Sequence, residues 1–188
     1  MREPSRSILD PQRAVLVVID VQEKLSAAMP KSVLRQVVKN TGVLIAAAAE
    51  LGFPVLLTEQ YPGGLGRTLP ELRQQLSGVE PIEKLAFSCC GEPAFAGFFS
   101  SSTSKQVILT GMETHVCVYQ TALDLLDGGH PVFVAADAVC SRSKANWRTG
   151  VEAMGRAGAV VGSTEMFLFQ MLKAAGSESF KKLAKLIQ

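Results

Sequence analysis

Three residues that could together form a nucleophilic site follow short apolar segments of the sequence. They are Asp20 after Ala14–Ile19, Lys84 after residues 81–83, and Cys117 just beyond residues 107–111. In an open parallel α/β sheet, ligands bind beyond the carboxyl ends of the strands, so we expect these side chains to meet in one pocket. A carboxylate, an ammonium and a thiol are the groups that a cysteine-nucleophile site requires.

The surroundings of Cys117 favour a reactive thiol. The segment TGMETHVCVYQTA, residues 110–122, places Cys117 in the first turn of a helix that follows a glycine-containing turn. Free backbone N–H groups and the helix dipole stabilise an anion there, so we expect a lowered thiol pKa and donors for an oxyanion. The alternative interpretation is a small buried hydrophobic residue, which is what most cysteines are.

Asp20 and Lys84 also have ordinary interpretations. Asp20 ends an otherwise apolar strand, where a carboxylate without a partner costs several kcal/mol, so its position implies a partner or a cleft. The alternative for Asp20 is a helix N-cap or a loop-binding residue. Lys84 could simply end a strand in solvent. The combination of the three residues, more than any one of them, indicates a site.

Composition limits the class of protein. The chain has 188 residues, 47% of them hydrophobic, which fits one globular domain over residues 1–188 with a polar N-terminal extension at residues 1–13. The net charge of +2 and the scattered basic residues argue against a nucleic-acid partner. Because the sequence lacks a long apolar run and a signal-peptide pattern, we expect no membrane partner and a cytoplasmic location.

The four cysteines favour thiols rather than a zinc site or a disulfide framework. They are Cys89, Cys90, Cys117 and Cys140, and they show neither CxxC spacing nor a nearby pair of histidines. Adjacent cysteines such as Cys89 and Cys90 rarely bridge without strain, so we interpret this pair as packing or incidentally exposed thiols. The sequence predicts no metal and no cofactor.

Strand-like and helix-like segments alternate along the chain. We expect strands at residues 14–19, 55–58, 81–84, 106–110, 131–135 and 159–161. We expect helices at residues 32–51, with Ser32 as the N-cap, and at 70–76, 93–99, 115–126, 145–157 and 163–172. Right-handed crossovers between these strands give an α/β fold, a doubly wound three-layer α/β/α sandwich with a six-stranded parallel sheet.

The motifs and their order resemble the isochorismatase-like cysteine hydrolases, a family that includes nicotinamidases and N-carbamoylsarcosine amidases. The resemblance covers nearly the whole chain. It rests on AVLVVIDVQ at residues 14–22, Lys84, GMETHVCV at 111–118 and ADAVCSRS at 136–143. The stretch TEQYPGGLG at residues 58–66 is most similar to the isochorismatase-domain-containing subgroup.

This resemblance implies a catalytic triad of Asp20, Lys84 and Cys117. Cys117 would carry the acyl group as a thioester, Lys84 would lower the thiol pKa, and Asp20 would pass the proton to the leaving group and later activate water. A non-proline cis peptide between Met112 and Glu113 would direct the N–H of Glu113, beside that of Cys117, into an oxyanion hole.

The resemblance also indicates which chemistry to expect. Nicotinamidases of this family hold a zinc-like metal with an Asp-x-His pair and a further histidine, but residues 58–61 here read TEQY, and His115 and His130 lie elsewhere. We therefore expect no metal and no nicotinamidase activity. The presence of Cys117 favours hydrolysis of a small amide or related carbonyl compound. A non-catalytic binding or interaction protein that retains the thiol is the alternative.

Further residues are expected to line the cleft or an interface. The strand-end argument places Gln22, Tyr61, Phe87 and Trp147 near the site as substrate-binding residues, with plain packing as the alternative for Phe87 and Trp147. The apolar residues 166–169 and 171–172 exceed what one helix face needs against a sheet. We expect a homo-oligomer that acts on a small-molecule substrate.

Overall fold

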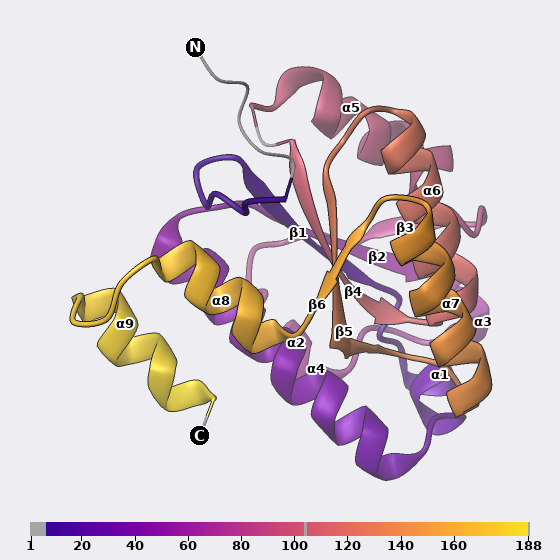
Figure 1. The fold of residues 1–188 in the computed structure, drawn as a ribbon. Coiled ribbons are helices and arrows are strands. Elements are labelled where there is room, and N and C mark those ends of the chain that lie inside the picture. Colours follow the sequence, from indigo (N-terminus) through magenta and orange to yellow (C-terminus); the bar gives the residue numbers. More distant parts are fainter. Residues whose placement is uncertain (1–6, 104, 188) are drawn as a thin grey trace.

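A computed structural model describes residues 7–103 and 105–187 of the chain. Its centre is a parallel six-stranded sheet with the order β3-β2-β1-β4-β5-β6 (Figure 1). The strands are β1 (Ala14–Ile19), β2 (Val55–Gln60), β3 (Ile82–Lys84), β4 (Gln106–Met112), β5 (Val132–Cys140) and β6 (Val160–Gly162). The doubly wound three-layer α/β/α sandwich expected from the sequence is confirmed.

Helices cover both faces of the sheet (Figure 1). One side carries α2 (Lys31–Leu51), α4 (Pro70–Arg73), α8 (Thr164–Leu172) and α9 (Glu178–Leu183), and the other carries α5 (Pro93–Ser101), α6 (Tyr119–Asp127) and α7 (Lys144–Arg156). The short helices α1 (Glu23–Ala27) and α3 (Pro62–Leu65) follow β1 and β2. No described helix combines the length and the apolar content that a bilayer crossing requires.

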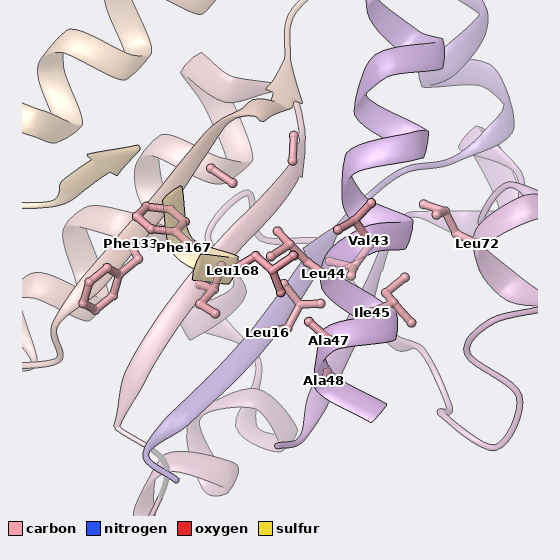
Figure 2. Packing of buried hydrophobic residues seen from close by; sticks show 14 of the residues in the cluster. Leu16, Val43, Leu44, Ile45, Ala47, Ala48, Leu72, Phe133, Phe167 and Leu168 are labelled. Carbon is pink, nitrogen blue, oxygen red and sulfur yellow. The ribbon is translucent and has the colours of Figure 1, made fainter. Parts of the chain in front are cut away.

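Separate apolar cores lie on the two faces of β1. Leu16 belongs to the core beneath α2, where Figure 2 shows it near Leu44, whereas Val17 belongs to the core beneath α6. Every residue of β1 is buried, as its continuous apolar sequence predicts for a central parallel strand. A strand buried on both faces gives a rigid support for Asp20, which follows it directly.

The strand order reverses between β1 and β4, and their carboxyl ends lie in close contact there. Gly111 of β4 pairs with Ile19 and has a φ of 113°. A Cβ at this position would lie 2.0 Å from the Ile19 carbonyl oxygen, so glycine is required for the approach. This reversal is the point at which doubly wound folds bind their ligands.

Some element boundaries differ from the sequence-based expectation. The structure places Pro30, not Ser32, at the N-cap position of α2, because the fixed φ of proline suits a helix start and Ser32 lies in the first turn. The helix expected at residues 115–126 is divided into a π-helical turn, η2 (Thr114–Val118), and α6. The expectation also omitted α9.

The described part of the N-terminal extension packs against the domain. Leu9 is fully buried, and its N–H donates to Gln170 Oε1 over 3.1 Å. The N–H of Asp10 donates to Gln106 Oε1 over 2.7 Å. Residues 1–6 of the expected extension lie outside the described residues.

Candidate functional site

Asp20 leaves β1 in a left-handed backbone conformation. Its φ is 52°, in the region that aspartate tolerates better than most residues. Its N–H donates to the Thr58 carbonyl over 3.2 Å, and its own carbonyl accepts the N–H of Gln22 over 2.8 Å. These bonds fix the turn, and the turn carries a fully buried carboxylate over the strand ends.

Lys84 compensates the buried charge of Asp20. Lys84 Nζ lies 2.7 Å from Asp20 Oδ2, and both side chains are 0% exposed. Burial disfavours the ammonium, but the Asp20 carboxylate and, to a lesser degree, the nearby thiols of Cys117 and Cys89 raise the pKa of Lys84 overall. Lys84 therefore stays charged at neutral pH.

The remaining contacts of Lys84 hold its ammonium in place. Nζ donates to Gln60 Oε1 over 2.7 Å and to the carbonyls of Phe87 and Ala86 over 3.1 and 3.3 Å. An ammonium has three protons, and these partners together with Asp20 use them all. Lys84 thus supplies charge and geometry to the site rather than a free donor for a ligand.

The Cys117 thiol lies beside this ion pair, in η2. Burial, followed by the negative charge of Asp20, raises the pKa of Cys117 to about 12, although Lys84 acts in the opposite direction. The expectation of a lowered thiol pKa is therefore wrong for the resting protein, because desolvation of a thiolate outweighs the attraction of one ammonium. A hydrogen bond between the thiol and Asp20 contributes to the raised pKa and places a proton acceptor at the nucleophile.

The residues expected to form an oxyanion hole lie at the junction of β4 and η2. The Met112–Glu113 peptide bond is cis. Glu113 is the N-cap of η2, and its carbonyl accepts the N–H groups of Val116 and Val118 over 3.0 and 3.3 Å. Its carboxylate accepts the backbone N–H of Arg142 over 3.0 Å and pairs with the guanidinium over 3.1 Å. Glu113, which precedes Cys117 in this segment, is therefore held through both its backbone carbonyl and its side chain.

Gln22, expected to bind substrate, holds the backbone instead. Its side-chain amide donates to the carbonyls of Gln60 and Gly66 over 3.0 and 2.7 Å, and its Oε1 accepts the N–H of Gln60 over 2.8 Å. Its side chain is fully buried. These bonds fasten the end of β2 to the loop that follows it.

The three aromatic residues expected near the site lie in two places. Tyr61 and Phe87 are 57% and 55% exposed; Tyr61 directly follows β2, and Phe87 lies in the loop beyond β3. The N–H of Tyr61 donates to the Lys84 carbonyl over 2.9 Å. Trp147 lines a mainly apolar cavity of about 630 Å³ whose lining contains none of the triad, and its indole N–H donates to the Ala136 carbonyl over 3.0 Å. Tyr61 and Phe87 thus contact Lys84 through their backbones, whereas Trp147 lies in a cavity that the triad does not line.

Two polar residues of β2 contact the triad and were missed by the sequence reasoning. Thr58 Oγ1 donates to Asp20 Oδ1 over 2.7 Å, and Gln60 receives the bond from Lys84. Residues two apart in a strand share a face. Two polar side chains on the same face of β2, Thr58 and Gln60, were the signal that could have identified them.

Glu59, between these residues, anchors the loop beyond β2. Its Oε1 accepts the N–H and the hydroxyl of Thr68 over 2.8 and 2.7 Å, and its Oε2 accepts from Arg67 over 2.9 Å. Burial acts to raise the pKa of Glu59, but the bonds from Thr68 and Arg67 together lower it. Glu59 is thus a buried carboxylate that stays ionised.

Metal ligands do not gather in the described residues: within residues 7–103 and 105–187, no three His, Cys, Asp or Glu side chains are placed to hold an ion. His115, two residues before Cys117, has its Nδ1 3.0 Å from Ser141 Oγ and its Nε2 3.2 Å from the side-chain nitrogen of Asn146. Its ring nitrogens are therefore occupied by residues outside the triad.

Comparison with known proteins matches residues 14–166 to the isochorismatase domain family. Isochorismatase domain-containing protein 2 of Danio rerio is 36% identical over 179 residues, which cover 95% of this chain and 89% of that protein. A solved structure described as the MAR1 ribonuclease of Caenorhabditis elegans is 36% identical, with a TM-score of 0.87 over 95% of this chain and 91% of that one. The ycaC gene product of Escherichia coli, described as an octameric hydrolase of unknown specificity, is 22% identical, with a TM-score of 0.87 over 98% of this chain and 92% of that one.

Proposed function

The chain belongs to the isochorismatase domain family, and from this premise we propose that it is a cysteine-dependent hydrolase of a small amide or related carbonyl compound. One observation carries the proposal: the buried Asp20 carboxylate lies 2.7 Å from the Lys84 ammonium, and the charges of both residues act on the pKa of the Cys117 thiol. A nucleophile, a base that reaches it and a cation that compensates the base are thereby assembled beyond the strand ends.

Attack begins from the neutral thiol. Cys117 Sγ forms a bond to the carbonyl carbon of the substrate while Asp20 accepts the thiol proton, so a free thiolate does not have to accumulate in the buried site. The carbonyl oxygen becomes an oxyanion, for which the backbone N–H groups of Glu113 and Cys117 are the proposed donors. Lys84 remains an ammonium throughout and balances the charge that moves between Asp20 and the substrate.

Two further proton transfers complete the reaction. As the C–N bond breaks, Asp20 returns its proton to the departing nitrogen, which leaves as an amine or ammonia and leaves a thioester on Cys117. Water then attacks the thioester while Asp20 accepts a proton from it. The C–S bond breaks, the carboxylic acid is released, and the proton on Asp20 returns to sulfur. The net reaction consumes one amide and one water.

Exposed apolar and aromatic residues indicate where substrate and a second subunit would lie. Tyr61, Phe87 and Leu85 are exposed around the Lys84 contacts, with Leu85 at 75%. We propose that Tyr61 and Phe87 contact the substrate, and that Trp147 does so only if the substrate extends toward its cavity. Exposed Met166 and Phe169 on α8 support a homo-oligomer, in keeping with the octamer described for the ycaC product.

Release of ammonia or amine from a panel of small amides and ureido compounds tests the proposal. The purified protein is expected to turn over at least one compound, and Cys117→Ala is expected to reduce that turnover to background. Cys90→Ala is the matched control, because Cys90 lies outside the triad contacts, and it is expected to retain activity. Turnover that survives in Cys117→Ala would overturn the nucleophile assignment. Binding of panel compounds with no turnover would favour the non-catalytic alternative.

A further inference from the structure

Asp20 has a partner that the proposed chemistry leaves without a role. Thr58 holds Asp20 twice: its carbonyl accepts the Asp20 N–H over 3.2 Å, and its hydroxyl donates to Oδ1 over 2.7 Å. Lys84 occupies the other carboxylate oxygen, Oδ2. Thr58 is fully buried. Both carboxylate oxygens are therefore fixed by side chains from neighbouring strands.

A second buried thiol continues this chain of hydrogen bonds. Cys89 Sγ lies 3.9 Å from Thr58 Oγ1 and donates to it, while the N–H of Cys89 donates to Thr121 Oγ1 over 2.9 Å. Burial, followed by the charge of Asp20, raises the pKa of Cys89 to about 12, so its sulfur keeps its proton at neutral pH. The bonds run from Cys89 through Thr58 to Asp20.

The direction of these bonds has a physical cause. A hydroxyl has one proton to donate and two lone pairs with which to accept. Because the Asp20 carboxylate can only accept, the Thr58 hydroxyl proton is directed at Asp20, and the Cys89 S–H donates to a lone pair of the same hydroxyl oxygen. A donor on Oδ1 restricts rotation of the carboxylate, which leaves its orientation toward Cys117 defined.

We propose that Thr58 is a positioning residue for the base Asp20, and that the Cys89 thiol acts through Thr58 by fixing its hydroxyl. This inference rests on the proposed function, since Asp20 must be the base for its orientation to matter. It adds residues of β2 and of the short helix η1 (Cys89–Gly91) to the functional unit. Cys89, first interpreted as packing, thereby has a role that its neighbour Cys90 does not share.

The rate of Cys117 alkylation by iodoacetamide, followed from pH 6 to pH 10.5, tests the inference without knowledge of the substrate. Thr58→Val removes the hydroxyl and keeps the shape, so the rate at pH 7 is expected to fall about tenfold, the loss that a hydrogen bond to a charged group produces. As the pH rises toward 10.5, a growing fraction of the thiol ionises without the base, so the rates of variant and native protein are expected to approach each other. Thr58→Ser restores the donor and is expected to restore the neutral-pH rate.

The charged and titratable neighbours of Asp20 in this experiment are Lys84, Cys117 and Cys89, and the Thr58 variants leave all three unchanged. Cys89→Ala tests the outer bond separately and is expected to lower the neutral-pH rate less than Thr58→Val does. Cys90→Ala is the matched control and is expected to leave the rate unchanged.

Three results would overturn the inference: a native neutral-pH rate in Thr58→Val, a rate lowered equally at every pH, or no recovery in Thr58→Ser. If Thr58→Val does not fold, a Cys89→Ala profile identical to that of Cys90→Ala would overturn the role of Cys89. Failure of the proposed function is a different result, in which Cys117 of the native protein reacts at pH 7 no faster than Cys140.

Discussion

Lys84 Nζ lies 2.7 Å from Asp20 Oδ2, and neither side chain is accessible to solvent. Each charge therefore depends on the other for compensation, and loss of one partner leaves a buried charge unpaired. Breaking such a pair costs about 3–5 kcal/mol, whereas removing both charges costs much less.

Lys84→Met is expected to lower the free energy of unfolding by about 3–5 kcal/mol for this reason. The measurement is urea unfolding at pH 7, with the double variant Lys84→Met, Asp20→Asn as the control. We expect the double variant to be more stable than Lys84→Met alone, because it buries no unpaired charge. Equal stability of Lys84→Met and the native protein would contradict the description of the pair as a mutually compensating one.

Gln22→Leu is expected to loosen the loop after β2. The substitution leaves the N–H and the carbonyl of Gln60, together with the Gly66 carbonyl, without their amide partner. An unsatisfied buried polar group costs about 1–3 kcal/mol, so hydrogen exchange of the Gln60 amide is expected to accelerate by about tenfold or more. Gln36→Leu, on the exposed part of α2, is the control. Unchanged protection at Gln60 would show that Gln22 does not hold this loop.

Stability is expected to fall as the pH rises from 8 to 10. The pKa values of Cys89, Cys117 and Cys140 are raised to about 12, primarily by burial, whereas a thiol in the unfolded chain ionises near its ordinary value of about 8.5. Above that value the unfolded chain has released protons that the folded protein retains. The free energy of unfolding then falls by up to about 1.4 kcal/mol per pH unit for each thiol.

Cys140→Ala isolates one of these thiols, because Cys140 lies outside the triad. We expect the unfolding free energy of Cys140→Ala to fall less steeply with pH than that of the native protein. The two slopes should differ by the contribution of one thiol, whatever the substitution costs at neutral pH. Lys84 titrates above this window, since its pKa is raised from an ordinary value near 10.4. Parallel curves for the two proteins would mean that Cys140 is not held neutral by burial.

Glu59 is expected to make the free energy of unfolding fall as the solution becomes acidic. Burial acts against its carboxylate, but the bonds from Thr68 and Arg67 give it a lowered pKa. Its stabilisation is therefore complete above the unfolded value of about 4.3 and is lost as the pH falls through the folded value. Glu59→Gln should be less stable than the native protein at pH 7, with a gap that narrows toward pH 3. Glu83 has a side chain that is 56% exposed, so Glu83→Gln should lower the free energy of unfolding less than Glu59→Gln does, and this loss should change less with pH.

The sequence predicted the fold and the convergence of the triad because both depend on patterns that it carries directly. Continuous apolar runs mark buried parallel strands; Asp20 directly follows such a run, and Lys84 ends a short strand. The chain turns where the strands end, so these side chains arrive at one edge of the sheet together with Cys117. The bounds of β1 follow from the same patterns.

The remaining features depend on three-dimensional neighbours. The pKa of Cys117 was expected to be lowered, because the helix start and Lys84 are visible in the sequence whereas the depth of burial is not. Thr58 and Cys89 lie 31 residues apart, and their bond depends on strand order and side-chain rotamers. The π-helical turn at Thr114–Val118 has the same apolar spacing as the start of an ordinary helix.

The most direct test of the account compares two thiols that differ in their neighbours. Cys117 and Cys140 are both buried, and the pKa of each is raised to about 12, but only Cys117 of the two has Asp20 and Lys84 among the causes of its shift. Their iodoacetamide alkylation rates at pH 7 would be measured by mass spectrometry after cleavage at aspartate, since Asp124, Asp127 and Asp137 separate them in the sequence. We expect Cys117 to react faster than Cys140, and we expect Asp20→Asn to slow the reaction of Cys117 by about 10²-fold or more. Equal rates for the two thiols, or a Cys117 rate unchanged in Asp20→Asn, would contradict the assignment of Cys117 as a nucleophile activated by Asp20.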